Sequence, residues 1–279
     1  MTSDCDLCGS TSRLPLPQDP RIAVCLRCGF VYVPERRTAE EVAQAWDDIY
    51  RNEQYSPKWP AVRARLFYVA EWIDQTIGFE GKSVLDIGAG DGFFLQQARM
   101  RGAHPVGLDP SSHNARGIRA LDMTCHEGSI AKVGPCGQYD IVTILWTLEN
   151  TTDCLAMLRY ARDRLLPGGH VVVATGSRIL VPPKKPLSSY LNPNVPADMH
   201  CFRFSVASLA KAMLKVGLSV LSQELRADIL LTRPLMNRPQ EQEWLVMAGL
   251  VRAPVDDYFP SDSPSAVLQH FADWARMWP

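Results

Sequence analysis

Residues 83–92 read Ser83-Val-Leu-Asp-Ile-Gly-Ala-Gly-Asp-Gly92, an apolar run that passes into alternating glycines. The run predicts a short, buried parallel strand. Glycines after such a strand let the backbone approach a ligand closely, where the next helix offers free N–H groups. The spacing is GxGxG rather than GxGxxG, because Phe93 stands where a pyrophosphate-binding loop has its third glycine. The stretch therefore predicts a ligand-binding turn, and it disfavours a dinucleotide-binding one.

The segments on both sides of this turn alternate between strand and helix patterns. After it we expect a helix over residues 93–101, strands over 105–109 and 139–145, an apolar-striped helix, the turn Leu166-Pro-Gly-Gly169 and a strand over 170–174. Before it, a polar helix is expected over residues 38–50 and an amphipathic helix after Pro60. The alternation predicts an α/β fold, a Rossmann-like parallel sheet with helices on both faces.

Asp109 ends the second predicted strand, the place where nucleotide-binding folds often carry an acidic residue. A carboxylate there accepts hydrogen bonds from ribose hydroxyls. The alternative is a turn-forming residue before Pro110. The glycine turn upstream favours the ribose role for Asp109.

With these features in order, residues 81–233 resemble the class I S-adenosylmethionine (SAM) methyltransferases. Asp86-Ile-Gly-Ala-Gly-Asp-Gly92 is similar to the first motif of that family, and His126-Glu-Gly-Ser129 falls where the family places residues that flank the adenine. The resemblance implies SAM as cofactor and a set of binding residues. These are Asp86, Gly88, Gly90, Asp109, Ser129 and Trp146, with Tyr55 from the preceding segment.

The family topology implies that the acceptor lies over the carboxyl ends of the fourth and fifth strands. Trp146, Glu149 and the loop over residues 181–199 reach that region, and His200 follows the loop. We predict His200 as the general base, because an unperturbed imidazole titrates near neutral pH; the alternative is that it packs against or caps the helix beginning at Ser205. Glu149 is the second predicted catalytic residue, and Asn150 stands where many relatives have His.

Four cysteines open the chain as two CxxC pairs, Cys5/Cys8 and Cys25/Cys28. Two such turns brought together by a hairpin present four thiolates to a tetrahedral Zn²⁺. A full set of thiolates leaves no open position, so the predicted zinc is structural. The alternatives are disulfides or a redox pair. Disulfides need an oxidising compartment, whereas the start MTSDCDLCGS lacks the pattern of a signal peptide, so we expect a cytoplasmic protein.

The first module also resembles the zinc ribbons of methyltransferases from polysaccharide and natural-product sugar pathways. The resemblance rests on Cys25-Leu-Arg-Cys-Gly-Phe-Val-Tyr32, on Pro34 and on the pair Tyr50/Tyr55. It implies O-methylation of a sugar, a sugar nucleotide or a glycosylated metabolite. Three alternatives stay open: an RNA base methyltransferase, a C-methyltransferase of a keto-sugar, and a SAM-binding scaffold without catalysis.

Composition bounds the partners and the domain plan. The formal net charge of −1 over 279 residues makes nucleic acid a disfavoured partner, and the chain has no apolar run long enough for a membrane span. The oligomeric state stays open.

Two late strands are expected near residues 218–224 and 228–232, and tail helices around Trp244 and Trp274. We predict a zinc module (1–35), a helical linker and cofactor lid (36–80), the SAM domain (81–233) and a C-terminal helical extension (234–279).

Overall fold

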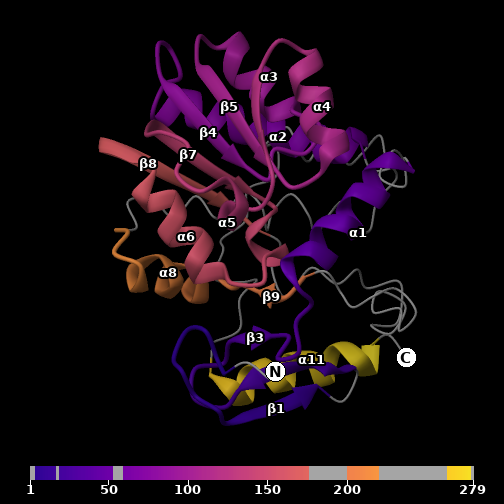
Figure 1. Cartoon of the computed structure of the whole chain (residues 1–279). Helices are drawn as coiled ribbons and strands as arrows, with labels where there is room; N and C mark the ends of the chain where they lie inside the picture. Colours follow the sequence, from indigo (N-terminus) through magenta and orange to yellow (C-terminus); the bar gives the residue numbers. More distant parts are fainter. Residues whose placement is uncertain (1–3, 17–18, 53–58, 176–199, 220–262, 278–279) are drawn as a thin grey trace. The chain divides into compact units, whose positions relative to one another are not determined.

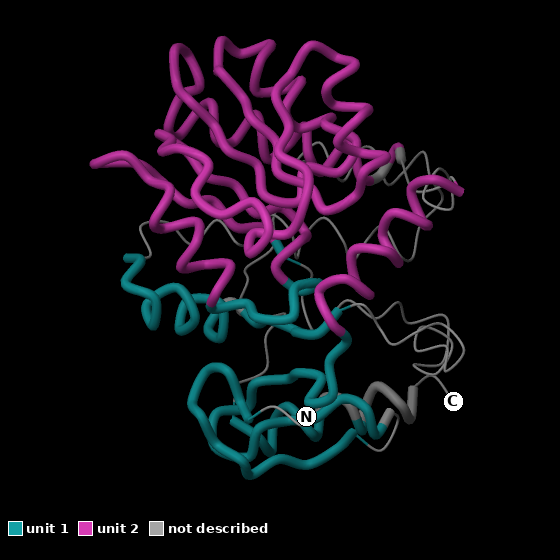
Figure 2. The backbone as a smooth tube through the Cα atoms, viewed as in Figure 1, with its two compact units in different colours: residues 1–37, 149–155, 175–279 teal, residues 38–148, 156–174 magenta. Residues whose placement is uncertain are grey.

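The computed structural model describes residues 4–16, 19–52, 59–175, 200–219 and 263–277 (Figure 1). These residues form two compact units that interleave along the chain (Figure 2). Unit 1 comprises residues 1–37, 149–155 and 175–279, and unit 2 comprises residues 38–148 and 156–174. The domain bounds expected from the sequence stay a prediction.

Unit 2 contains a five-stranded sheet in the order β6-β5-β4-β7-β8, and all of its neighbouring strands are parallel. The strands are β4 (Ser83–Ile87), β5 (His104–Asp109), β6 (Thr124–Glu127), β7 (Tyr139–Leu145) and β8 (Leu165–Ala174). From β4 the chain proceeds to one side through β5 and β6, and then returns to add β7 and β8 on the other. Ligands bind at the carboxyl ends of the strands where such a reversal occurs, which here is between β4 and β7.

Helices flank this sheet (Figure 1). They are α2 (Trp59–Thr76), α3 (Phe93–Met100), α4 (Ser112–Ala120), α5 (Ile130–Val133) and α6 (Cys154–Asp163), while α1 (Ala39–Arg51) packs against α4. Thr38 and Glu41 form a capping box that begins α1, and Ser111 caps α4. Consecutive residues of β4 and β7 are buried, which requires that both faces of the sheet are covered.

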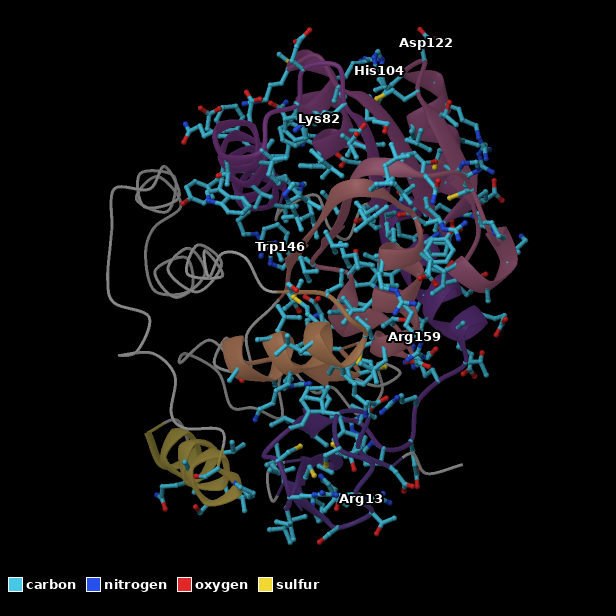
Figure 3. All side chains as sticks on the ribbon, turned by 90° about the vertical axis from the view of Figure 1, so that its left-hand side faces the viewer. Arg13, Lys82, His104, Asp122, Trp146 and Arg159 are labelled. Atoms are coloured by element: carbon cyan, nitrogen blue, oxygen red, sulfur yellow. The ribbon has the colours of Figure 1, made fainter. Side chains whose placement is uncertain are left out.

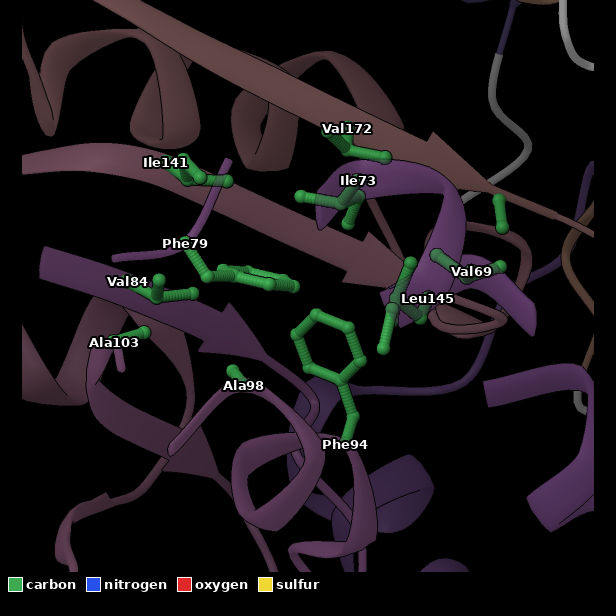
Figure 4. Close-up of a cluster of buried hydrophobic side chains, with 12 residues drawn as sticks. Val69, Ile73, Phe79, Val84, Phe94, Ala98, Ala103, Ile141, Leu145 and Val172 are labelled. Carbon is green, nitrogen blue, oxygen red and sulfur yellow. The ribbon is translucent and has the colours of Figure 1, made fainter. Parts of the chain in front are cut away.

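The core of unit 2 lies where α2 and α3 pack against β4, β7 and β8 (Figure 4). Phe79 and Phe94 meet edge to face at its centre, with ring centroids 6.2 Å apart. Aromatic pairs of this geometry contribute about 0.5–1.5 kcal/mol beyond the burial of their area. This packing fixes β4 and α3, which carry the two sides of the glycine turn.

Unit 1 is built on a second, four-stranded sheet in the order β1-β2-β3-β9. Its strands are β1 (Arg13–Leu16), β2 (Asp19–Cys25), β3 (Val31–Tyr32) and β9 (Phe202–Arg203), and its helices are α8 (Val206–Lys215) and α11 (Pro264–Met277). Leu16, Ile22, Val24 and Val31 of the sheet bury a small core together with Val267 of α11. None of the described helices is both long and apolar enough to span a membrane.

Most elements expected from the sequence are confirmed. The sequence does not predict the strand β6 or the helices α4 and α5. The chain over Leu166–Gly169 belongs to β8, with an irregular register opposite β7, rather than to a turn. β9 pairs with β3, which joins segments far apart in the chain. The strands expected near residues 218–224 and 228–232 fall almost wholly outside the described residues, and the helix expected around Trp244 lies outside them; the helix around Trp274 is α11.

Candidate functional site

The glycine turn adopts backbone conformations that other residues rarely take. Gly88, Gly90 and Gly92 have φ angles of 80°, 55° and 78°, in the left-handed region. A Cβ on Gly88 would lie 2.2 Å from Oγ1 of Thr147, the second residue after β7. A Cβ on Gly92 would lie 2.8 Å from Ile118 of α4. Glycine is therefore required both by the turn and by the side chains that close in on it.

Asp109 lies at the carboxyl end of β5 and points its carboxylate at this turn. Its Oδ2 accepts a hydrogen bond from the Gly90 amide at 2.8 Å. Its Oδ1 accepts from the Ser111 amide at 2.9 Å and from the Asn114 side chain at 3.2 Å. Burial raises the pKa of Asp109 to about 6, although these donors oppose the shift. Three donors leave lone pairs on the two oxygens, so the carboxylate has room to accept a ribose hydroxyl.

Asp86 is the other buried carboxylate of the turn. It accepts a hydrogen bond from Oγ1 of Thr143, its neighbour on β7, at 2.7 Å. Burial raises the pKa of Asp86 to about 7; the Thr143 hydroxyl lowers it, and the charge of Asp109 raises it further. Asp86 thus titrates near neutral pH, close to the residue that is expected to hold the ribose.

Trp146 directly follows β7, at the edge of the sheet opposite Lys82 and His104 (Figure 3). Its φ of 51° is unusual for a residue with a side chain, and its amide donates to the carbonyl of Ala174 at 2.6 Å. The guanidinium of Arg65, on α2, lies over the indole ring at 4.3 Å from its centroid. Strained backbone gathers at binding sites, which supports a ligand contact at Trp146.

Tyr50 and Arg65 also lie in this region, and the sequence alone does not predict a binding role for either residue. The Tyr50 hydroxyl lies only 3.0 Å from the position of a Cβ on Gly90, so α1 reaches the glycine turn. Of the sequence pair Tyr50/Tyr55, the resemblance predicts Tyr55 as the binding residue, and Tyr55 lies outside the described residues. Nothing in the sequence indicates that Arg65 contacts Trp146, because arginines on a helix usually face solvent.

The remaining predicted residues take up separate places. Ser129 caps the short helix α5, just after β6, whose residue Glu127 is in register with Asp109. Glu149 is buried in unit 1 and accepts a hydrogen bond from Thr175 at 2.8 Å. His200 also belongs to unit 1, where its side chain is exposed and its carbonyl accepts from Arg203. The catalytic roles of Glu149 and His200 stay predictions.

The four N-terminal cysteines come together in unit 1. Their sulfur atoms all lie within 4.8 Å of one another, with Cys5 and Cys28 at 3.6 Å and Cys8 and Cys25 at 3.4 Å. A tetrahedral zinc with Zn–S bonds of about 2.3 Å needs sulfurs roughly 3.8 Å apart, so this cluster suits Zn²⁺. Each CxxC turn closes in the same way, because the amides of Gly9 and Gly29 bond the carbonyls of Cys5 and Cys25.

Arg36 ties this cysteine cluster to the rest of unit 1. Its guanidinium pairs with both carboxylate oxygens of Asp6, at 2.9 and 2.5 Å, and lies 4.5 Å from the ring centroid of Phe202 in β9. It also donates to the carbonyls of Val33 and Thr152. This bidentate pairing with a carboxylate requires the planar guanidinium group of an arginine. The first CxxC turn is therefore held from β3, from β9 and from the segment over residues 149–155.

The sheet order, the glycine turn at the reversal point and the buried Asp109 together define a Rossmann-like methyltransferase domain of the SAM-dependent class. The turn and Asp109 fit that cofactor: the turn lies at the carboxyl end of β4, where ligands bind in such sheets, and the Asp109 carboxylate faces it. The family described as "Methyltransferase domain" matches residues 52–223, and the chain belongs to this family.

Similar proteins agree on the domain and cover part of the chain. A ubiquinone biosynthesis O-methyltransferase of Marinobacter nauticus is 30% identical over 149 residues, which is 50% of this chain and 60% of its own length. That of Vibrio parahaemolyticus is 32% identical over 152 residues, covering 52% and 63%. The structure of a complex between the Haloferax volcanii Trm112 methyltransferase activator and a methyltransferase superposes with a TM-score of 0.51 at 22% identity, over 66% of this chain and 78% of the other. This last likeness concerns the fold alone.

Proposed function

We propose that this protein is a SAM-dependent O-methyltransferase that acts on a hydroxyl group of a small molecule. The observation that carries the proposal is the buried Asp109 carboxylate at the end of β5, which faces the Gly90 turn. SAM supplies a methyl group on a sulfonium, ready for in-line displacement. The protein has to hold the cofactor, orient the acceptor and remove a proton from it.

The residues divide these tasks. Asp109 accepts the ribose hydroxyls, the glycine turn admits the amino-acid part of the cofactor, and Ser129 flanks the adenine. Trp146, at the end of β7, bounds the acceptor. His200 removes the proton from the acceptor hydroxyl, and Glu149 orients the acceptor. The four cysteines hold a structural Zn²⁺ that stabilises unit 1.

For the acceptor we infer a sugar-type molecule, a sugar nucleotide or a glycosylated metabolite. The support is the resemblance of residues 25–55 to the zinc ribbons of sugar-pathway methyltransferases. A second candidate is a phenolic acceptor, favoured because the curated relatives at 30–32% identity act in ubiquinone biosynthesis by name. The net charge of −1 disfavours RNA.

The cofactor is tested with S-adenosylhomocysteine in isothermal titration calorimetry. We expect binding by the wild type and at least tenfold weaker binding by Asp109→Ala, because a buried acceptor of the ligand is lost. Asp48→Ala, an exposed aspartate, is the control. No binding by the wild type, or equal binding by Asp109→Ala, would overturn the SAM assignment.

The acceptor is tested by methyl transfer from labelled SAM to three sets of compounds: nucleotide sugars, dihydroxybenzoates and transfer RNA. Turnover on nucleotide sugars supports the first assignment, and turnover on dihydroxybenzoates alone supports the phenolic one. With a working acceptor, His200→Ala should lower kcat by about 10²-fold or more and leave the affinity for S-adenosylhomocysteine unchanged. Unchanged turnover would remove His200 from the base role.

A further inference from the structure

Helix α1 carries a buried carboxylate that its own packing does not explain. Val42 and Asp47 are its buried residues, and Asp47 is 7% exposed. Arg51, one turn further along α1, pairs with Asp47, but its own side chain is 55% exposed. A buried carboxylate is costly unless its hydrogen bonds are satisfied, so the partners of Asp47 on other elements explain its place.

Those partners form the start of α4. Oδ1 of Asp47 accepts from the Ser111 hydroxyl at 2.6 Å and from the His113 amide at 3.1 Å. These donors and that of Arg51 lower the pKa of Asp47 to about 2, although burial opposes them, so the carboxylate stays charged. A negative charge at a helix N-terminus is favourable, because free N–H groups and the helix dipole point at it. Asp47 thus fastens α1 to the first turn of α4.

The same serine also holds the ribose-binding carboxylate. The Ser111 amide donates to Asp109, while the Ser111 hydroxyl donates to Asp47 and accepts from the Asn114 amide at 3.2 Å. The side chain of Asn114 donates to Asp109 as well. Asp47, Ser111, Asn114 and Asp109 are each less than 8% exposed, so water does not substitute for these bonds.

A second contact runs from α1 to the same site. Tyr50 lies three residues after Asp47, on the same side of the helix, and its hydroxyl lies over Gly90. The Gly90 amide in turn donates to the other oxygen of Asp109. Helix α1 therefore approaches Asp109 from two directions, through Ser111 on one oxygen and over Gly90 on the other.

We propose that Asp47 is a positioning residue for the cofactor: it fastens α1 to α4 and thereby orients Asp109 and holds Tyr50 over the glycine turn. Cofactor binding and docking of α1 are then coupled, and each stabilises the other. The inference rests on the proposed SAM-dependent function. It assigns a role to a helix that precedes the glycine turn by more than thirty residues.

The experiment compares a graded series of variants in their affinity for S-adenosylhomocysteine. Asp47→Asn keeps an acceptor for Ser111 and His113 but loses the charge, and Asp47→Ala loses the acceptor. We expect roughly threefold weaker binding for Asn and at least tenfold for Ala, because charge-assisted hydrogen bonds are about twice as strong as neutral ones. Asp48→Asn and Asp48→Ala are the matched controls, since Asp48 is adjacent, exposed and bonded to Gln44.

Hydrogen exchange separates a positioning role from a cap that only stabilises α4. In the wild type, S-adenosylhomocysteine should slow amide exchange over residues 39–51, and in Asp47→Ala this slowing should be lost. Ser111→Ala should reproduce the loss of affinity, and the double variant should be no weaker than either single one. A lower melting temperature with affinity within twofold of the Asp48 controls would overturn the inference. Absence of binding by the wild type would overturn the proposed function itself, and the inference with it.

Discussion

Two buried carboxylates, Asp86 and Asp109, flank the glycine turn in different surroundings. Asp109 accepts from three N–H groups, whereas Asp86 accepts from the Thr143 hydroxyl. The raised pKa of Asp109, about 6, leaves it mostly ionised at neutral pH, while Asp86, at about 7, is half protonated. A residue that accepts ribose hydroxyls must be ionised to do so fully. The two residues therefore predict different responses to pH.

The affinity for S-adenosylhomocysteine should fall as the pH drops through about 6, because protonation of Asp109 removes part of its acceptor capacity. Titration calorimetry from pH 8 to pH 5 measures this, and Asp109→Asn should bind weakly with a flatter profile. Protonation of Asp86 and Asp109 should not unfold the protein over this pH range and so should not disturb the titration. A carboxyl whose pKa is raised in the folded state stabilises the fold as the pH falls from its folded-state pKa toward its unfolded-state pKa. An affinity that stays constant down to pH 5 would contradict this role of Asp109.

Asp86→Asn should raise the melting temperature at pH 8 and leave it nearly unchanged at pH 4. The folded-state pKa of Asp86 lies above the unfolded value, so its ionisation costs stability as the pH rises from about 4 to 7. The gain at pH 8 is on the order of 1–3 kcal/mol, and Asn keeps an acceptor for the Thr143 hydroxyl. Calorimetry at both pH values checks this; an equal shift at both would point to packing instead. Weaker cofactor binding is the expected cost.

At the level of elements, the sequence predicted the strands that carry continuous apolar runs, and it missed those that depend on tertiary contacts. β4 and β7 are buried over nearly all of their length, and β5 over its carboxyl half, so their composition reveals them. β6 reads Thr-Cys-His-Glu and has no apolar run, and β9 has two residues whose pairing with β3 no local pattern encodes.

The residues of the candidate site also divide into those that the sequence predicts and those that depend on tertiary contacts. Gly88, Gly90 and Asp109 follow from their places after strands, whereas Asp47 has no such signal. Asp47 and Asp48 are neighbours on a polar helix, and the sequence alone does not distinguish the aspartate that faces α4 from the one that faces solvent. The orientation of α1, which depends on the whole of unit 2, decides between them.

Arg36→Met should destabilise unit 1 by about 3–5 kcal/mol, because it leaves the largely buried Asp6 without its cation. Arg162→Met is the control, since Arg162 and its partner Asp163 are 40% and 49% exposed, and surface pairs contribute less than about 1 kcal/mol. Hydrogen exchange over residues 4–33 measures the change. Adding Asp6→Asn should restore part of the loss; if it restores nothing, the ion pair is not the cause.

At the scale of the whole molecule, removal of the zinc that we propose for the cysteine cluster should act on one unit and spare the other. The four cysteines belong to unit 1, and Gly90, Asp109 and Asp47 belong to unit 2. A chelator should therefore raise amide exchange over residues 4–33, and we expect the acceptor KM to rise with it. The affinity for S-adenosylhomocysteine should stay within about threefold.

Two comparisons complete the chelation experiment. Cys136 lies outside the cluster, so the substitution Cys136→Ser should leave amide hydrogen exchange over residues 4–33 unchanged. If the affinity for S-adenosylhomocysteine collapses when the metal is removed, the two units unfold as one cooperative body, and the separation of their roles is wrong.

The pairing of β3 with β9 has a consequence for biosynthesis. β3 ends at Tyr32, and its partner begins at Phe202, so the ribosome must add some 170 residues before the last strand of this sheet exists. At about 5–20 residues per second this takes roughly 10–30 s, during which the edge of β3 has no native neighbour. A metal captured early by the four thiols would keep the nascent hairpin folded through that interval. Cells starved of zinc during translation should then accumulate misfolded chains, even where zinc is restored afterwards.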